Sequence, residues 1–312
     1  MSLREKIRNP AQPVILYELI PPAVGASEEL GEKVSLVREL DGEIDAVNIP
    51  EIREESRQGT RPTRMPERIE PRVFAQAIRK GAGVETVINR VTVHDAPSDQ
   101  LRWLKETRSD YGIGNLILVG GESHSVSYPG LGVPETAALA IDEGLDLLLG
   151  GITIPSRSQE AARIRKKYER GLRFFTTQVL LDSNDIVDLI QSLDGLDVRI
   201  FLSFSPISNS KDVEFLRWLG VDVPKNVSWS IAQETGAGNA VEKSIVQAVK
   251  ILTDVFENLP AHPPSLGINV EQIARRGNEP ARKMLGTLGP LYRRFVSARY
   301  SISASQRQPA SL

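Results

Sequence analysis

Residues 14–22 read Val-Ile-Leu-Tyr-Glu-Leu-Ile-Pro-Pro, a short apolar run that carries one carboxylate, Glu18, and ends in two prolines. The apolar residues predict a buried strand, and the prolines force the chain out of regular structure directly after it. A carboxylate among such neighbours is costly to bury. Glu18 is therefore either a functional group at a strand end or an acid on a partly exposed strand.

Seven further apolar runs follow along the chain, and amphipathic segments separate them. The expected strands are 14–20, 44–49, 84–93, 115–119, 145–152, 174–180, 198–204 and 266–270. The expected helices are 27–40, 71–80, 97–111, 134–143, 158–170, 184–192, 211–219, 240–257 and 279–297. Because strands and helices alternate and the strands are apolar throughout, the pattern predicts a (β/α)8 TIM barrel built on a parallel sheet.

A doubly wound open sheet is the competing α/β fold. It would favour a glycine-rich phosphate-binding turn after an early strand, and Pro21 and Pro22 stand there instead. We therefore expect a single barrel domain over residues 1–300 and a disordered tail over residues 301–312.

The chain has 312 residues, a formal net charge of −2, no cysteine and three histidines. This small charge gives no reason to expect nucleic acid or an anionic membrane as a partner. The lack of cysteine excludes disulfides, thiolate metal ligands and cysteine nucleophiles, and His94 and His124 at strand ends are too few to predict a metal site. Because the first residues have no apolar core and no apolar run reaches about 18 residues, we expect a cytoplasmic protein without a membrane span.

Polar residues stand where the predicted strands end, the edge at which barrels gather their functional groups. Among them are Glu18, Asn48, Glu122 and Gln178. Acids, amides and hydroxyls without many cations suit a neutral, hydrogen-bonding heterocycle better than a phosphorylated ligand. An amide such as Gln178 can pair with an aminopyrimidinone ring, and a carboxylate can accept from the exocyclic amine of that ring. Gly120 and Gly121 either let a flat ring approach the backbone or serve a turn.

Three blocks of this sequence resemble motifs of the methylenetetrahydrofolate reductase family. Residues 17–22, Tyr-Glu-Leu-Ile-Pro-Pro, are similar to the family's Phe-Glu-Phe-Phe-Pro-Pro. Residues 115–122, Asn-Leu-Ile-Leu-Val-Gly-Gly-Glu, are similar to its Asn-Ile-Leu-Ala-Leu-Arg-Gly-Asp. Residues 164–182 keep the family's spacing of Lys167, Gly171, Phe174, Thr177-Gln178 and Asp182. The order and separation of the blocks suit the family's FAD-binding barrel, which would cover nearly the whole chain.

The resemblance implies a role for each matching residue. Glu18 would be the general acid that protonates N10 of the folate and opens its methylene bridge. Gln178 and Glu122 would contact the pterin, and we add Asn48 and Gly121 as substrate-binding candidates at the same edge. The family reaction reduces 5,10-methylenetetrahydrofolate to 5-methyltetrahydrofolate in one-carbon metabolism and methionine biosynthesis, with FAD as cofactor and NAD(P)H as reductant.

The sequence departs from the family mainly at positions that contact the flavin. The family's His-Leu-Thr-Cys becomes Arg-Val-Thr-Val over residues 90–93, and its Arg-Gly-Asp becomes Gly-Gly-Glu over residues 120–122. Its Tyr-Pro-Glu-x-His becomes Ile-Pro-Ser-Arg-Ser over residues 154–158. The cofactor-binding candidates that remain are Thr92, Gly120, Gly121, Lys167 and Arg157. Arg157 either binds a pyrophosphate at a helix start or is a solvated helix charge.

Two hypotheses of different classes follow for the function. The first is an oxidoreductase of the methylenetetrahydrofolate reductase type, either with FAD or with direct hydride transfer from NAD(P)H. The second is a protein that binds reduced folate without redox activity, as a partner of a methyltransferase. A pterin-dependent methyltransferase barrel is a third, but such proteins usually need a corrinoid or thiol partner, and this chain has no thiol. The sequence leaves a homo-oligomer and the choice between NADH and NADPH open.

Overall fold

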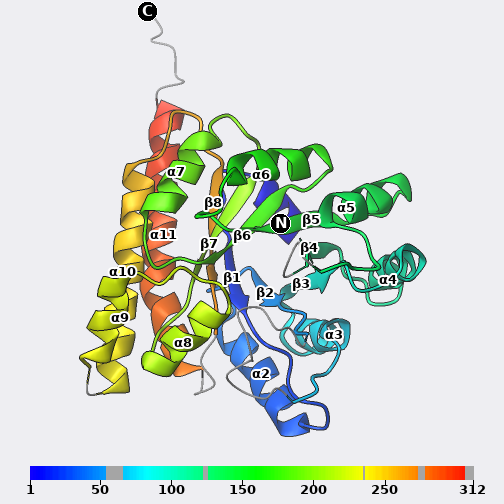
Figure 1. Cartoon of the computed structure of the whole chain (residues 1–312), viewed down its shortest axis with the longest axis horizontal. Coiled ribbons are helices and arrows are strands. Elements are labelled where there is room, and N and C mark those ends of the chain that lie inside the picture. The colour runs from blue at the N-terminus through cyan, green and yellow to red at the C-terminus, as the bar shows by residue number, and fades with distance from the viewer. Residues whose placement is uncertain (54–65, 122–125, 235, 273–277, 306–312) are drawn as a thin grey trace, which may run out of the picture.

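The structure, a computed structural model, describes residues 1–53, 66–121, 126–234, 236–272 and 278–305. Its centre is a closed barrel of parallel strands in which β8 returns to pair with β1 (Figure 1). The strands are β1 (Ile15–Glu18), β2 (Ala46–Ile49), β3 (Glu85–Val91), β4 (Asn115–Val119), β5 (Leu148–Thr153), β6 (Phe174–Val179), β7 (Arg199–Phe204) and β8 (Ser265–Val270). The molecule is a (β/α)8 TIM barrel, so the predicted fold is confirmed.

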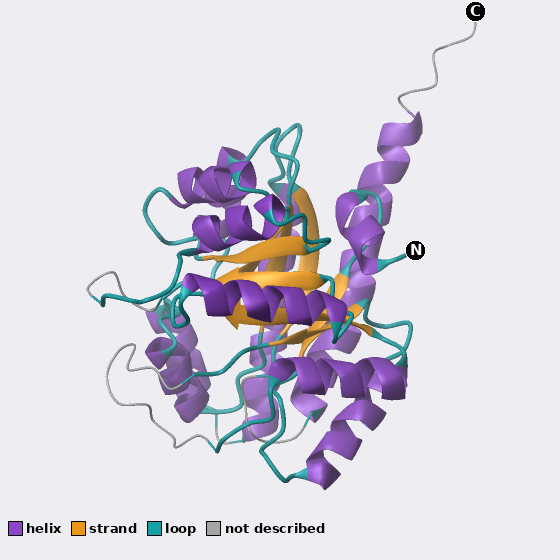
Figure 2. Ribbon diagram, turned by 90° about the vertical axis from the view of Figure 1, so that its right-hand side faces the viewer, coloured by secondary structure: helices purple, strands orange, loops and turns teal. Residues whose placement is uncertain are grey.

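Helices surround the barrel and connect its strands (Figures 1 and 2). They are α1 (Leu3–Arg8), α2 (Ser27–Glu39), α3 (Pro71–Ala82), α4 (Pro97–Ser109), α5 (Val133–Asp142), α6 (Glu160–Glu169), α7 (Asn184–Ser192), α8 (Ser210–Trp218), α9 (Lys225–Ala232), α10 (Ala237–Glu257) and α11 (Glu279–Ser305). The sequence patterns did not predict α1 or α9. Helix α11 continues to Ser305, and the remainder of the predicted tail lies outside the described residues. Among the described helices, none has the length and apolar character that a membrane span needs.

The barrel has an inner and an outer apolar layer because side chains alternate along each strand. The inner layer fills the barrel itself with Val14, Leu16, Ala46, Val87, Ile117, Leu148, Phe174 and Phe201. The outer layer packs the opposite faces of the strands against the helices. Glycine is required at Gly150, where a Cβ would lie 2.5 Å from the Phe174 ring, and at Gly267, which Phe201 crowds in the same way. The two large rings therefore fill space that the glycines leave open.

The amino end of the barrel is closed by α1 and by a buried arginine. Arg199 opens β7, is 1% exposed, and donates to the carbonyl oxygens of Lys6, Ile7, Asn9 and Leu266 at 2.6–3.1 Å. The first three carbonyls lie at the C-terminal end of α1. A cation there donates hydrogen bonds to carbonyls without a helical partner and also interacts favourably with the negative end of the helix dipole. Helix α1 is thereby fixed across the floor of the barrel, and ligands must approach from the carboxyl end.

Replacing Arg199 with methionine should lower the free energy of unfolding by about 3 kcal/mol or more, because several buried carbonyls lose their donor at once. Urea denaturation of wild type and R199M measures this loss. The matched control is Arg165→Met, because Arg165 is exposed and bonds one carbonyl, that of Ser192. We expect R165M to stay within about 0.5 kcal/mol of wild type. Equal stability of R199M and wild type would contradict the proposed closure.

Candidate functional site

Polar side chains form the top layer inside the barrel, at the carboxyl ends of the strands. Strand alternation explains their direction: Glu18 follows Leu16 by two residues, and Ser203 follows Phe201 by two, so each polar residue faces the barrel axis as its apolar neighbour does. The layer contains Glu18, Asn48, Asn89, Ser203, Asn269 and Glu271. The arrangement brings together Glu18 and Asn48, which the sequence predicted, with four strand-end groups to which it gave no role.

Glu18 ends β1 in a setting that favours its protonated form. It pairs in register with Asn48 of β2, whose Nδ2 donates to Glu18 Oε2 at 3.4 Å. Burial raises the pKa of Glu18 well above its usual value, and the nearby Glu271 carboxylate raises it further. Both effects therefore favour the protonated form of Glu18.

Glu271 lies directly after β8 and is the second acid of the site. Asn269 Nδ2 donates to Glu271 Oε1 and to Ser203 Oγ, at 3.1 Å each, and the Ser203 hydroxyl also bonds the Glu271 carboxylate. Burial raises the pKa of Glu271 to about 7, while these hydrogen bonds oppose the rise. An acid after the last apolar run was the available sequence signal. Its pairing with Glu18 depends on barrel closure.

Three buried amide oxygens in this layer lack a hydrogen-bond partner in the described part of the chain. They are the Oδ1 atoms of Asn48, Asn89 and Asn269, whose residues are 1%, 9% and 0% exposed. A buried acceptor without a donor costs about 1–3 kcal/mol, so such atoms are rare unless water or a ligand satisfies them. The layer thus presents carbonyl acceptors to whatever enters the barrel.

A β-bulge sets the position of Gln178. The pairing of β6 with β7 shifts register between Thr176 and Val179, and the Ser203 amide donates to the Thr177 hydroxyl in place of a regular ladder bond. Gln178 Nε2 donates at 3.1 Å to the carbonyl of Leu219, beyond α8, which fixes the amide plane. Gln178 is thus held at the same edge of the barrel as Glu18, as predicted, between β6 and the α8 segment.

The loop after β4 contains the remaining substrate candidates. Glu122 and its neighbour His124 lie outside the described residues. Gly121 has no room for a side chain, because a Cβ there would clash with the Tyr128 ring, which packs edge-on against His94. Gly120 has ordinary space around it. The ring that comes close to Gly121 is therefore Tyr128 of the protein, and the approach of a ligand ring there stays a prediction.

The side chains predicted to hold FAD bond to the protein itself. The Thr92 hydroxyl is buried and donates to the Leu131 carbonyl at 2.9 Å. Lys167 Nζ donates to the Ile152 carbonyl at 2.8 Å, and burial lowers the pKa of this amine to about 8. Arg157 Nε bonds the buried Glu160 carboxylate at 2.7 Å. As they lie, these residues do not fit a flavin, and FAD as a cofactor stays a prediction.

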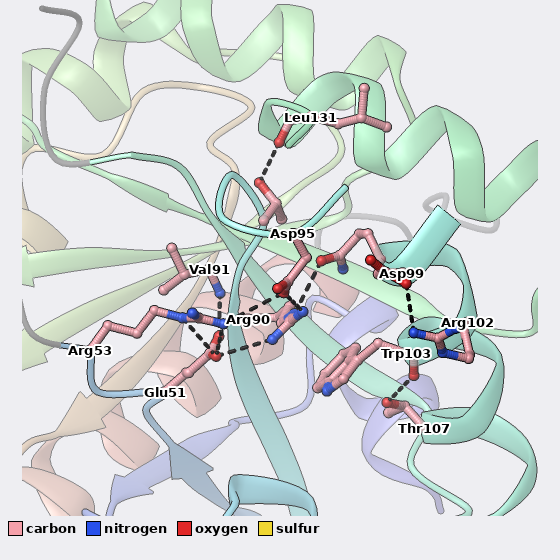
Figure 3. Close-up of polar contacts among 12 residues, drawn as sticks. Glu51, Arg53, Arg90, Val91, Asp95, Asp99, Arg102, Trp103, Thr107 and Leu131 are labelled. Atoms are coloured by element: carbon pink, nitrogen blue, oxygen red, sulfur yellow. Dashed lines mark hydrogen bonds and ion pairs between the residues drawn. The ribbon is translucent and has the colours of Figure 1, made fainter. Parts of the chain in front are cut away.

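Arg90, which stands where the resemblance would place a histidine, points away from the barrel axis into a charged cluster (Figure 3). Its guanidinium donates to Glu51 Oε1 at 3.0 Å and also bonds Asp95, and it stacks at 4.4 Å on the Trp103 ring. Glu51 in turn accepts from the Val91 amide at 2.6 Å. The cluster ties the segment after β2 to β3 and α4.

A cleft of 420 Å³ lies beside this cluster, between the ends of β2 and β3 and the helices α3 and α4. Its arginines are already paired: Arg90 with Glu51 and Asp95, Arg72 with Glu70 and Glu106, and Arg102 with Asp99. Because these charges are mutually neutralised, the cleft has less to offer an incoming anion than its arginine content suggests. The acid pair and the open amide oxygens make the barrel mouth the better candidate site.

Comparison with known families decides the class of protein. A family model described as "Mycobacterial methylenetetrahydrofolate reductase" matches residues 13–270, which contain the whole barrel sheet and end one residue before Glu271. The chain belongs to this family. The resemblance read from the three sequence blocks is therefore confirmed. No curated protein sequence matches the chain.

Solved structures share the fold of this family member. An uncharacterized protein from Clostridium thermocellum that binds two copies of 5-methyl-5,6,7,8-tetrahydrofolic acid is 21% identical, with a TM-score of 0.70 over 93% of this chain and 99% of that one. Tryptophan synthase from Mycobacterium tuberculosis is 13% identical, with a TM-score of 0.50 over 93% of this chain and 96% of that one. At these identities the likeness shows the fold alone.

The two half-buried acids should make the folded state less stable as the pH rises. Each carboxyl has a higher pKa in the folded chain than its usual value of 4.5, so it binds its proton more tightly when the chain is folded. The free energy of unfolding therefore falls as the pH rises from 4.5 through the pKa of the folded state, which is about 7 for Glu271. Near pH 8, Glu271→Gln should therefore raise the melting temperature by about 2–4 °C or more, with little change near pH 4.5. Thermal unfolding at both pH values measures this. The exposed Glu214→Gln is the control and should leave the melting temperature unchanged at both pH values. Equal changes of melting temperature in the two variants would contradict the burial penalty.

Proposed function

We propose that this chain reduces 5,10-methylenetetrahydrofolate to 5-methyltetrahydrofolate with NAD(P)H as reductant. The observation that carries the proposal is the position of the Glu18 carboxyl at the barrel mouth beside Glu271, where burial and this like charge raise its pKa. Family membership supports the reaction class. The Clostridium thermocellum protein of the same fold binds a reduced folate, which supports the ligand class.

The proposed reaction needs one proton and one hydride. Glu18 gives its proton to N10 of the folate, the bond between N10 and the bridging carbon breaks, and that carbon remains on N5 as an iminium cation. The carbon then accepts a hydride from NAD(P)H and becomes the N5-methyl group, which leaves NAD(P)⁺ and a Glu18 carboxylate. A proton from solvent restores Glu18. A general acid must hold its proton until the transfer, and burial beside Glu271 raises the pKa of Glu18 in the direction that this role needs.

The open amide oxygens support a pterin as the bound ring. A pterin carries an exocyclic amine and ring N–H groups, which are donors, and the Oδ1 atoms of Asn48, Asn89 and Asn269 are acceptors without a donor in the described part of the chain. Binding would satisfy atoms whose burial otherwise costs stability. A neutral ring among amides also explains why few cations line this edge.

A second candidate function is supported by the flavin-side residues. Because Thr92, Lys167 and Arg157 bond to the protein itself, a protein that binds reduced folate without redox activity is the alternative. It would keep the pterin contacts and leave Glu18 without a proton-transfer role.

The two candidates differ in an assay with purified protein, methylenetetrahydrofolate and either NADH or NADPH, run with and without added FAD. We expect nicotinamide oxidation matched by 5-methyltetrahydrofolate, which mass spectrometry identifies. The visible spectrum of the purified protein reports bound flavin directly. If no nicotinamide is oxidised in any arm while the folate still binds, the reductase proposal is wrong and the folate-binding alternative holds.

Glu18→Gln should lower turnover at least about 100-fold, since it removes the proton donor and keeps the shape of the side chain. Its affinity for 5-methyltetrahydrofolate, measured by calorimetry, should stay within about tenfold of wild type. Gln178→Ala is the matched contrast, because it should weaken folate binding about five- to tenfold through the loss of polar contacts to the ring. A Glu18→Gln enzyme with nearly full turnover would contradict the acid role.

A further inference from the structure

Two carboxyl groups meet on neighbouring strands where the barrel closes. The parallel pairing of β1 with β8 sets Tyr17 opposite Val270, so the next residue on each strand is Glu18 and Glu271. Both follow inward-facing residues by two positions and therefore face the barrel axis. The closure of the sheet brings them together, although they are separated by most of the chain.

The two acids are held by unequal sets of hydrogen bonds. Glu271 accepts from Asn269 Nδ2 at 3.1 Å and bonds the Ser203 hydroxyl, and its own amide donates to the Phe204 carbonyl at 2.8 Å. Glu18 accepts one long bond, from Asn48 Nδ2 at 3.4 Å. Hydrogen-bond donors stabilise a carboxylate, so the negative charge belongs on Glu271 and the proton on Glu18.

The strands beside the pair supply neutral groups in the part of the chain that the structure describes. Strand β2 contributes Asn48, β8 contributes Asn269 and β7 contributes Ser203. The charged group that acts on Glu18 is Glu271, a like charge. Two carboxylates so close and partly buried cannot both ionise easily near neutral pH, so they titrate as a coupled pair.

We propose that Glu18 and Glu271 form a dyad that holds one proton, in which Glu271 is a positioning residue that keeps this proton on Glu18. The assignment rests on the proposed function for its catalytic meaning and on the strand register and hydrogen bonds for its geometry. In the proposed reaction Glu18 gives up the proton as the folate becomes an iminium cation. Two carboxylates then face a positive charge, which offsets their repulsion at that moment.

The dyad makes the pH dependence of the reaction a property of the pair. For a general acid, kcat/KM falls as the pH rises through the apparent pKa at which the free enzyme loses the shared proton. Glu271→Gln removes the like charge, so Glu18 loses its proton at lower pH. The high-pH limb of the kcat/KM profile should therefore shift to lower pH by about one unit or more. Glu271→Asp keeps the charge and should return the limb toward that of wild type.

Carbon NMR of protein labelled at the glutamate carboxyls tests the dyad without any turnover. We expect the Glu18 signal, assigned by its loss in E18Q, to titrate well above 4.5 in wild type and to move down in E271Q. The exposed Glu214→Gln is the control and should leave both the Glu18 titration and the pH profile unchanged.

The outcomes separate the dyad from the proposed function. An unshifted pH limb in an active E271Q enzyme, or a Glu18 signal that titrates near 4.5 in wild type, overturns the dyad and leaves the reductase standing. Coupled titration of the two acids in a protein without reductase activity supports the dyad and overturns the proposed function. A limb shift in E271Q that Glu271→Asp reverses supports both.

Discussion

The buried guanidinium of Arg199 is the interaction on which the arrangement of this barrel depends. It satisfies the carbonyls at the end of α1 and one carbonyl of β8, and so joins the first helix, the seventh strand and the eighth strand at one point. Tyr292 of α11 reinforces the joint, because its hydroxyl donates to Leu266 and accepts from the Val14 amide. With the amino end closed in this way, an apolar layer fills the barrel above it, and the polar groups of the candidate site lie at the carboxyl end.

The separation of the apolar interior from the polar carboxyl end has an energetic consequence for the barrel mouth. Below it, the Phe174 and Phe201 rings fill the barrel at close contact, edge to face at 5.9 Å. Above them, two acids and several amides are buried with fewer partners than a stable interior would demand. A protein optimised for stability alone would replace them with apolar groups, as buried polar groups cost more than they contribute unless they are fully satisfied. Their presence in a closed barrel supports the proposal that this layer binds a ligand.

The sequence predicted much of the fold because the parallel strands are buried on both faces and so appear as near-continuous apolar runs. It did not predict α1, since six mostly polar residues carry a helical signal only in the spacing of Leu3 and Ile7, whose burial needs the barrel floor to exist. Glu18 was singled out by its local cost of burial, which left a structural role open, and the family resemblance supplied its role as an acid. Its partner Glu271 was not, because the pairing of the first strand with the last is a long-range consequence of closure that no local pattern contains.

The contrast between the two halves of the candidate site supports a folate over a flavin as the ligand of the barrel mouth. A side chain that binds a ligand through a hydrogen bond has an unpaired donor or acceptor in the free protein. If that group were bonded within the protein, the internal bond would have to break before the ligand could bind, at a cost in binding free energy. The Lys167 amine and the Thr92 hydroxyl on the flavin side are already bonded to backbone carbonyls. The Asn48 and Asn269 oxygens on the folate side are not bonded to any described residue. A flavin would have to break existing bonds to reach Lys167 and Thr92, whereas a pterin would complete bonds that Asn48 and Asn269 leave open and would meet an existing bond only at Gln178.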